Sequence, residues 1–65
     1  MKKLSQSRLA DTVMNGRKEK GMTQAQLADA TGINRALISR IEQKDFVPSI
    51  EQLESLSEVL NFDLT

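Results

Sequence analysis

Apolar residues recur along the chain at the three- and four-residue spacing of an amphipathic helix. The positions with this spacing are Leu9 and Val13; Leu27 and Ala28; Ile38 and Ile41; and Ile50, Leu53, Leu56 and Leu60. Polar residues separate them, so each segment has one apolar face for a core. We therefore predict four helices, over residues 5–19, 24–31, 35–43 and 50–60.

The predicted helix starts coincide with residue types that cap helices. These residues are Ser5, Thr23, Asn34 and Ser49, whose side-chain oxygens accept hydrogen bonds from unpaired amides of the first turn. Thr23 with Gln26, and Ser49 with Gln52, have the spacing of a capping box. Gly32 follows the second helix, where a left-handed residue favours glycine. Local chemistry and apolar spacing thus predict the same boundaries.

The last six residues follow a different pattern. Apolar and polar residues alternate from Leu60 to Thr65, which is typical of a strand. A single strand leaves its backbone groups unpaired, so it needs a second edge. One interpretation is pairing with a second copy across a twofold axis, with Leu60, Phe62 and Leu64 at the dimer interface. The other interpretation is a frayed chain end after the fourth helix.

The composition excludes several kinds of site. The 65 residues contain no cysteine and no histidine, which excludes disulfides and the usual zinc sites, and we predict no metal and no cofactor. So small a domain is marginally stable by itself, which favours self-association. No signal peptide or membrane-spanning run is present. We expect a cytoplasmic protein with no membrane partner.

The formal net charge is zero, but the charges are unevenly distributed. Residues 1–40 carry eight basic and three acidic side chains, whereas residues 41–65 carry one basic and six acidic ones. Binding to a polyanion requires local charge and not a basic total. The distribution is consistent either with a DNA-binding face or with ordinary solvated surface charge.

Residues 24–43 have the pattern of two helices joined by a short turn. Ala28 is small enough for the second helix to cross close to it, and Gly32 allows a sharp turn. The remaining apolar positions, which fill the space between the two helices, are Leu27, Ile33, Ile38 and Ile41. This pattern predicts a helix-turn-helix within one domain that covers residues 1–65.

A set of residues carries a resemblance to a known family: Gly21, Thr23-Gln24, Leu27-Ala28, Gly32, Ile38-Ser39-Arg40-Ile41-Glu42 and Pro48-Ser49. Over residues 8–60 the chain resembles the lambda-repressor-like (Cro/XRE-type) helix-turn-helix family. The resemblance implies an all-α, compact domain of four to five helices whose third helix reads DNA bases. Family members are dimeric repressors or antitoxins. The chain ends where a fifth helix begins in that family. Either the sequence is truncated there, or the terminal strand replaces that helix, as in antitoxins resembling the HipB type.

The resemblance implies DNA contacts for Thr23, Gln24, Asn34, Arg35, Ala36, Ser39, Arg40 and Gln43. Gln24 matches a phosphate-contacting residue at a helix start. Arg35 and Arg40 share the outer face of the third helix. There each arginine either donates two hydrogen bonds to the edge of a guanine or contacts phosphate without reading the sequence. Ala36 either meets a thymine methyl group or simply permits close approach.

The resemblance also implies a structural ion pair between Arg17 and Glu42, which orients the third helix. This chain departs from the family at Lys44, where glycine is common, so that a lysine takes the left-handed conformation. It departs again at residues 45–47, which are acidic and then apolar where phosphate contacts are common. The exposed or buried state of Phe46 and Val47 decides whether they form a protein contact.

No catalytic constellation or phosphate-binding loop is present, so the sequence does not predict an enzyme. Two functions remain. One is a sequence-specific double-stranded DNA-binding transcriptional regulator, a repressor, that acts as a homodimer on a palindromic operator. The other is an antitoxin that binds a protein toxin and regulates its own operon. Fold alone does not choose between them.

Overall fold

The computed structural model describes residues 6–63, with side chains from residue 8 onward. The described part of the chain consists of four helices: α1 (Gln6–Glu19), α2 (Gln24–Thr31), α3 (Arg35–Glu42) and α4 (Ile50–Leu60). The all-α prediction is confirmed, and each predicted helix boundary lies within one residue of the observed one. The predicted cap at Ser5 lies outside the described residues.

The predicted caps explain where the helices begin. The Thr23 hydroxyl accepts a hydrogen bond from the amide of Gln26 (3.0 Å), and the Gln26 side chain accepts one from the amide of Thr23 (2.8 Å). Ser49 and Gln52 form the same reciprocal pair at the start of α4. The side chain of Asn34 accepts a 2.7 Å hydrogen bond from the amide of Ala36. Each cap satisfies amides that have no partner inside the helix.

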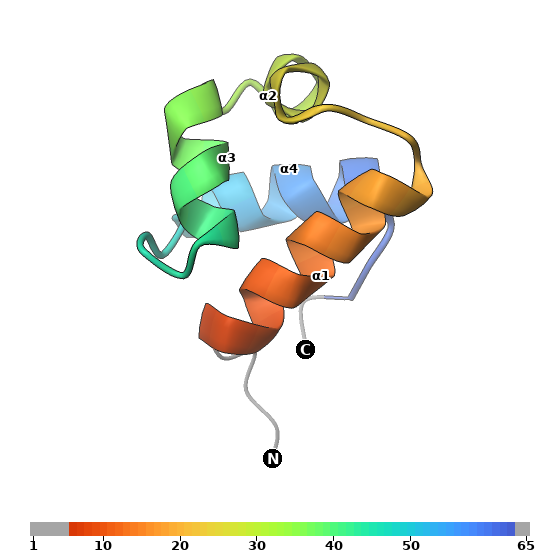
Figure 1. Ribbon diagram of the computed structural model, residues 1–65. Helices are drawn as coiled ribbons and strands as arrows, with labels where there is room; N and C mark the ends of the chain where they lie inside the picture. The colour runs from red at the N-terminus through yellow and green to blue at the C-terminus, as the bar shows by residue number, and fades with distance from the viewer. Residues whose placement is uncertain (1–5, 64–65) are drawn as a thin grey trace.

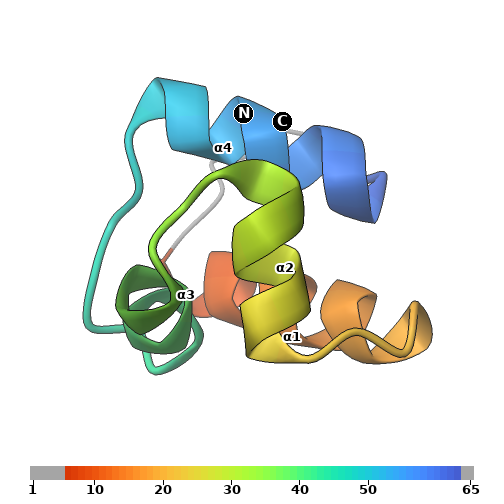
Figure 2. The ribbon, with the colours of Figure 1, turned by 90° about the horizontal axis from the view of Figure 1, so that it is seen from above.

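Figures 1 and 2 show how the helices are arranged. In Figure 1, α2 is seen end-on at the top while α3 runs down the left side; in Figure 2, turned by 90°, α3 is seen end-on and α2 lies in the plane of the picture. The two helices therefore cross steeply. α1 packs against α3 and α4, and α2 packs against α3 and α4. α3 is thus held in place by its packing against α1 and α2.

The core lies where these four helices meet. Its largest fully buried side chains are Leu27, Ile38, Ile41, Leu56 and Val13. They come from all four helices, because each helix contributes the apolar face that its spacing predicts. Burying an aliphatic side chain of this size stabilises the fold by about 1.5–3 kcal/mol. Packing of these faces, and not helix propensity, holds such short helices together.

The turn between α2 and α3 is fixed by local hydrogen bonds. Gly32 has a φ of 75° and donates its amide to the carbonyl of Ala28 (2.8 Å). The Thr31 hydroxyl donates to the carbonyl of Leu27 (2.8 Å) and accepts a hydrogen bond from the amide of Ile33 (3.2 Å). Because a side chain at Gly32 would be strained in the left-handed region, glycine suits this turn.

The predicted strand does not begin at Leu60. α4 continues through this residue, whose side chain is only 7% exposed, and Asn61 ends the helix with a φ of 62°. Leu60 lies four residues after Leu56, so the helical spacing overrides the period-two pattern. Residues 61–63 form no strand, and Leu64 lies outside the described residues.

The end of α4 packs unusually close to α1. A Cβ atom added at Gly16 would lie 3.3 Å from the Cβ of Leu60. Such a distance is tighter than ordinary van der Waals contact, so the glycine allows the two helices to approach. None of the described helices is long and apolar enough to cross a membrane.

Candidate nucleic-acid interface

The outer face of α3 carries most of the residues predicted to contact DNA. Asn34, Arg35, Ala36 and Arg40 are exposed on it, and Ser39 is half-buried. The opposite side of the same helix is closed by Ile38 and Ile41, which are 0% and 1% exposed. The amphipathic pattern of α3 therefore turns its polar residues outward while the isoleucines anchor it. Gln43, just after the helix, is also exposed.

Several of these polar side chains already have partners within the chain. The Asn34 side-chain oxygen caps α3, so its amide nitrogen remains as a donor. Gln43 donates from Nε2 to the Ser39 hydroxyl over 3.1 Å. Thr23 uses its hydroxyl to cap α2. These bonds reduce the rotational freedom of the face before any DNA binds.

An open hollow of about 530 Å³ lies beside the start of α3. Its lining residues are Ala25, Ala28, Asp29, Gly32, Ile33, Asn34 and Arg35. Small residues of α2 create the hollow, and Arg35 borders it. Within the described chain, no three histidine, cysteine, aspartate or glutamate side chains come together as they would to hold a metal ion.

The predicted ion pair between Arg17 and Glu42 is present, and it is well shielded. Arg17 Nε donates to Glu42 Oε2 over 2.7 Å, and Nη2 donates to Oε1 over 3.1 Å. The two side chains are 14% and 4% exposed. Arg17 Nη1 also donates to the carbonyl oxygen of Met22 over 2.9 Å. The guanidinium thus joins α1, the loop after it and the end of α3.

The hydrogen bond to Glu42 raises the pKa of Arg17 above its ordinary value, although burial opposes this shift. An arginine with a raised pKa stays charged at every pH used for proteins. The paired geometry is bidentate, which is the strongest arrangement for a guanidinium and a carboxylate. The pair therefore joins α1 to α3 and helps set the position of α3.

Gln24 belongs to this same cluster, which the sequence did not indicate. Its Nε2 atom donates to Glu42 Oε1 over 3.1 Å, and its side chain is half-buried at the start of α2. Glu42 therefore connects α1, α2 and α3. The Gln24 amide group keeps a second N–H and its oxygen for another partner, so a phosphate contact stays a prediction alongside the observed internal bond.

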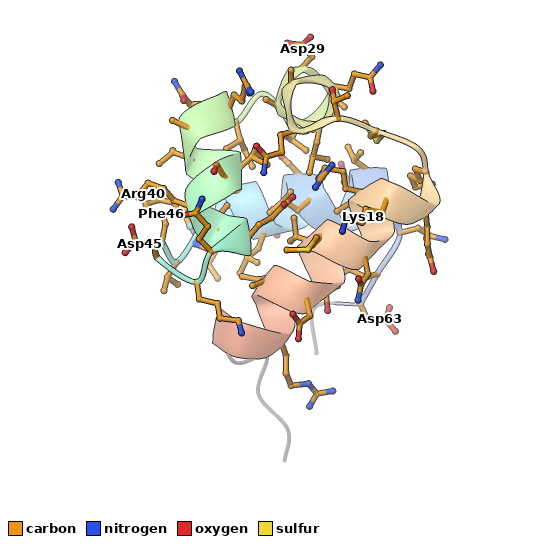
Figure 3. All side chains as sticks on the ribbon, in the orientation of Figure 1. Lys18, Asp29, Arg40, Asp45, Phe46 and Asp63 are labelled. Carbon is orange, nitrogen blue, oxygen red and sulfur yellow. The ribbon has the colours of Figure 1, made fainter. Side chains whose placement is uncertain are left out.

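Arg40 also has a local environment that its position on α3 alone does not indicate. Its Nε atom lies 3.3 Å from Asp45 Oδ2, and Nη2 lies 3.4 Å from the Asp45 carbonyl oxygen. The guanidinium carbon lies 5.9 Å from the centre of the Phe46 ring. Figure 3 shows these three residues together at the end of α3. Phe46 is half-buried, whereas Val47 is 66% exposed.

A turn with Lys44 in the left-handed region brings Asp45 back beside Arg40. Lys44 has a φ of 65°, as its place in a glycine position predicts. Its amide donates to the carbonyl of Ile41, and the amide of Asp45 donates to that of Arg40 over 2.8 Å. These two bonds define a Schellman motif. The sequence signal for the Arg40–Asp45 contact is their separation by five residues across such a turn.

Comparison with known proteins agrees with this arrangement. The family model described as helix-turn-helix matches residues 13–65 of the chain. The chain belongs to the helix-turn-helix family. This helix-turn-helix protein is also similar to the ImmF control region 10 kDa protein of Bacillus phage phi105, with 33% identity over 61 residues, covering 94% of the chain and 68% of the relative. No solved structure matches the chain.

Membership confirms the lambda-repressor-like resemblance, and it explains why the two steeply crossed helices carry the exposed polar face. In a helix-turn-helix, the second helix of the pair enters the major groove and the first crosses the backbone. In this helix-turn-helix protein the second helix of the pair is α3 and the first is α2. Which of their side chains contact bases and which contact phosphate stays a prediction.

Replacing Gln24 with alanine is expected to weaken binding by a similar factor for two kinds of duplex. One is selected from a random pool for tight binding, and the other has a random sequence. Loss of one hydrogen bond to a charged phosphate changes the binding free energy by about 1.5–3 kcal/mol, or about 12- to 150-fold in affinity. Fluorescence anisotropy on both duplexes at one salt concentration measures it. Ala25→Ser, at the next and exposed position of α2, is the control. A loss confined to the selected duplex would contradict the phosphate assignment.

Proposed function

We propose that this chain is a sequence-specific double-stranded DNA-binding transcriptional repressor that acts as a homodimer on a palindromic operator in the cytoplasm. The observation that carries the proposal is the outer face of α3, where Asn34, Arg35, Ala36 and Arg40 are exposed above a fully buried pair of isoleucines. A helix anchored in this way presents rigid donors to a groove. Each of the two arginines on this face has paired N–H donors that match the O6 and N7 acceptors of a guanine.

The similar protein of phage phi105 supports a regulatory role, because its name places it in a control region. In this proposal the domain acts through occupancy of a DNA site. Repression then follows from exclusion of other proteins from the operator. We propose no catalytic activity for the chain.

Selection of bound duplexes from a random pool tests this function. We expect enrichment of two inverted half-sites whose centres are one helical turn apart, about 34 Å or 10–10.5 base pairs. The affinity for the selected duplex should exceed that for random DNA by about 10³-fold or more at physiological salt. A pool that shows no enrichment over its starting composition would contradict sequence-specific binding.

Two surfaces compete for the dimer interface. The sequence predicts Phe62 and Leu64 at the chain end, together with Leu60, which in the structure is buried in the chain's own core. The structure instead exposes two large apolar side chains at the start of α4, Val47 at 66% and Ile50 at 70%. Exposed apolar pairs of this kind support a contact with a second copy.

Of the two surfaces, we propose the one with Val47 and Ile50 as the dimer interface. A chain with Val47→Ser and Ile50→Ser is expected to be monomeric in sedimentation equilibrium at a concentration where the wild type is dimeric. A chain that ends at Asn61 is expected to remain dimeric. The reverse outcome would assign the interface to the chain end. A wild-type chain that is monomeric at all concentrations and on its selected DNA would contradict the homodimer.

The same exposed pair favours one alternative, an antitoxin that binds a protein toxin. Val47 lies just before α4 and Ile50 begins it, and the same helix carries the acidic residues Glu51, Glu54 and Glu58. This surface suits a partner with an apolar patch ringed by basic groups. Co-purification from the native host distinguishes the two functions. A stoichiometric partner that arrests growth when produced alone would establish the antitoxin; its absence favours the repressor.

A further inference from the structure

The guanidinium of Arg40 is surrounded on one edge and one face by the loop that follows α3. Asp45 takes the edge formed by Nε and Nη2, with its carboxylate at 3.3 Å and its carbonyl oxygen at 3.4 Å. Phe46 lies against a face, with the guanidinium carbon 5.9 Å from the ring centre. Both side chains of the pair remain well exposed, at 52% for Arg40 and 68% for Asp45.

The loop itself is held in place by the fold. The Schellman motif fixes the backbone of Asp45 to that of Arg40 through a 2.8 Å hydrogen bond. Phe46 packs against the hydrophobic core with its remaining surface. A Schellman motif commonly joins its third-last helical residue to the second residue after the cap by an apolar contact. Here those two positions are Arg40 and Asp45, and an ion pair replaces that contact.

The edges of a guanidinium are chemically distinct. Of its five N–H groups, two form a side edge, one from Nε and one from Nη2, and two form an end edge, one from each Nη atom. Asp45 occupies the side edge. The end edge keeps two parallel N–H groups, which match the O6 and N7 acceptors of a guanine in the major groove. The internal contacts therefore leave the fork that DNA recognition requires.

A long exposed arginine loses rotamer freedom when it binds, and a side chain already held in place loses less. We infer that Asp45 and Phe46 are positioning residues that hold Arg40 in orientation to read one base pair, so that an acidic loop contributes to sequence specificity. The inference rests on the proposed DNA-binding function. It predicts that removing a negative charge beside DNA reduces discrimination, whereas simple phosphate repulsion by Asp45 predicts tighter binding.

Affinities of variants for defined duplexes test the inference. Arg40→Ala first identifies the base pair that Arg40 reads, because substituting this base pair no longer changes the affinity of that variant. Asp45→Asn and Phe46→Leu are then expected to lose about 2- to 5-fold of the discrimination at that base pair, with discrimination at other base pairs unchanged. The melting temperature should stay the same for the exposed Asp45. It should fall for Phe46→Leu, because Phe46 packs against the core, so the affinities are measured well below the melting transition. Phe46→Tyr keeps the ring and should retain wild-type discrimination. Asp63→Asn removes the same charge far from Arg40, as Figure 3 shows, and should have no effect.

A double variant separates positioning from other effects. In the Arg40→Ala background, Asp45→Asn should cause no further loss of discrimination, because the side chain that it positions is absent. Asp45→Asn that binds all duplexes more tightly with unchanged discrimination would overturn the inference while leaving the proposed function intact. A wild-type chain that binds no duplex would overturn the proposed function and this inference with it.

Discussion

Replacing Arg17 with methionine is expected to lower the free energy of unfolding by about 3–5 kcal/mol, because the Glu42 carboxylate then stays buried without its counter-charge. Glu42 is only 6% exposed, and Arg17 provides two of the hydrogen bonds to it. The free energy of unfolding of a small domain is about 5 kcal/mol, at the lower end of the usual range for proteins. The variant should therefore keep only about 0–2 kcal/mol, and its thermal and urea transitions, followed by circular dichroism, should shift strongly to lower temperature and lower urea concentration.

The double variant Arg17→Met, Glu42→Leu is the control for this effect. It removes the buried charge together with its partner, and apolar replacement of a buried pair is often neutral. We expect the double variant to be more stable than the single one, although Gln24 loses its acceptor on Glu42. If the single variant lowers the free energy of unfolding by less than about 1 kcal/mol, the pair contributes no more than an ordinary surface ion pair.

The second large effect is expected at the interface. Arg40→Ala should weaken binding to the selected duplex by about 5- to 150-fold, which corresponds to the 1–3 kcal/mol typical of a bidentate contact to guanine. Binding to random DNA should weaken far less, since only one of several positive charges is lost. Arg40 is exposed on α3, and its interactions with Asp45 leave the end edge of the guanidinium open. Fluorescence anisotropy on both duplexes measures the ratio.

Arg40→Lys distinguishes base reading from charge. A lysine keeps the positive charge but cannot fork onto two acceptors. If Arg40 reads a guanine, the lysine variant should lose discrimination nearly as fully as the alanine variant while binding random DNA as well as the wild type. Equal losses of Arg40→Ala on selected and random DNA would assign this arginine to phosphate.

Local interactions made the secondary structure predictable. A helix cap joins residues that are three positions apart, as with Thr23 and Gln26, and the residues of one helix face are three or four positions apart. The left-handed turns at Gly32 and Lys44 are equally local, since each depends on one residue's φ. For the same reason the outer face of α3 was predictable: once the isoleucines are buried, the residues on the opposite side of the helix must point outward.

Contacts between residues distant in the sequence were predictable only in part. The Arg17–Glu42 pair was implied by a family resemblance and not by any pattern within the chain. The bond of Gln24 to Glu42 had no signal, because it depends on the ends of α2 and α3 meeting in space. The close approach of α1 and α4 at Gly16 was missed for the same reason. The terminal strand was predicted from alternation, yet burial of Leu60 extends α4 through that residue.

The sequence by itself determined which helices form, where they begin and end, and which side of each one faces the core. It did so because capping, turn formation and amphipathic spacing involve neighbours along the chain. Only the tertiary structure decided how donors are shared among Arg17, Gln24 and Glu42. It also decided that Asp45 and Phe46 surround Arg40. Such choices depend on distances across the fold, and those distances exist only once the four apolar faces have packed together.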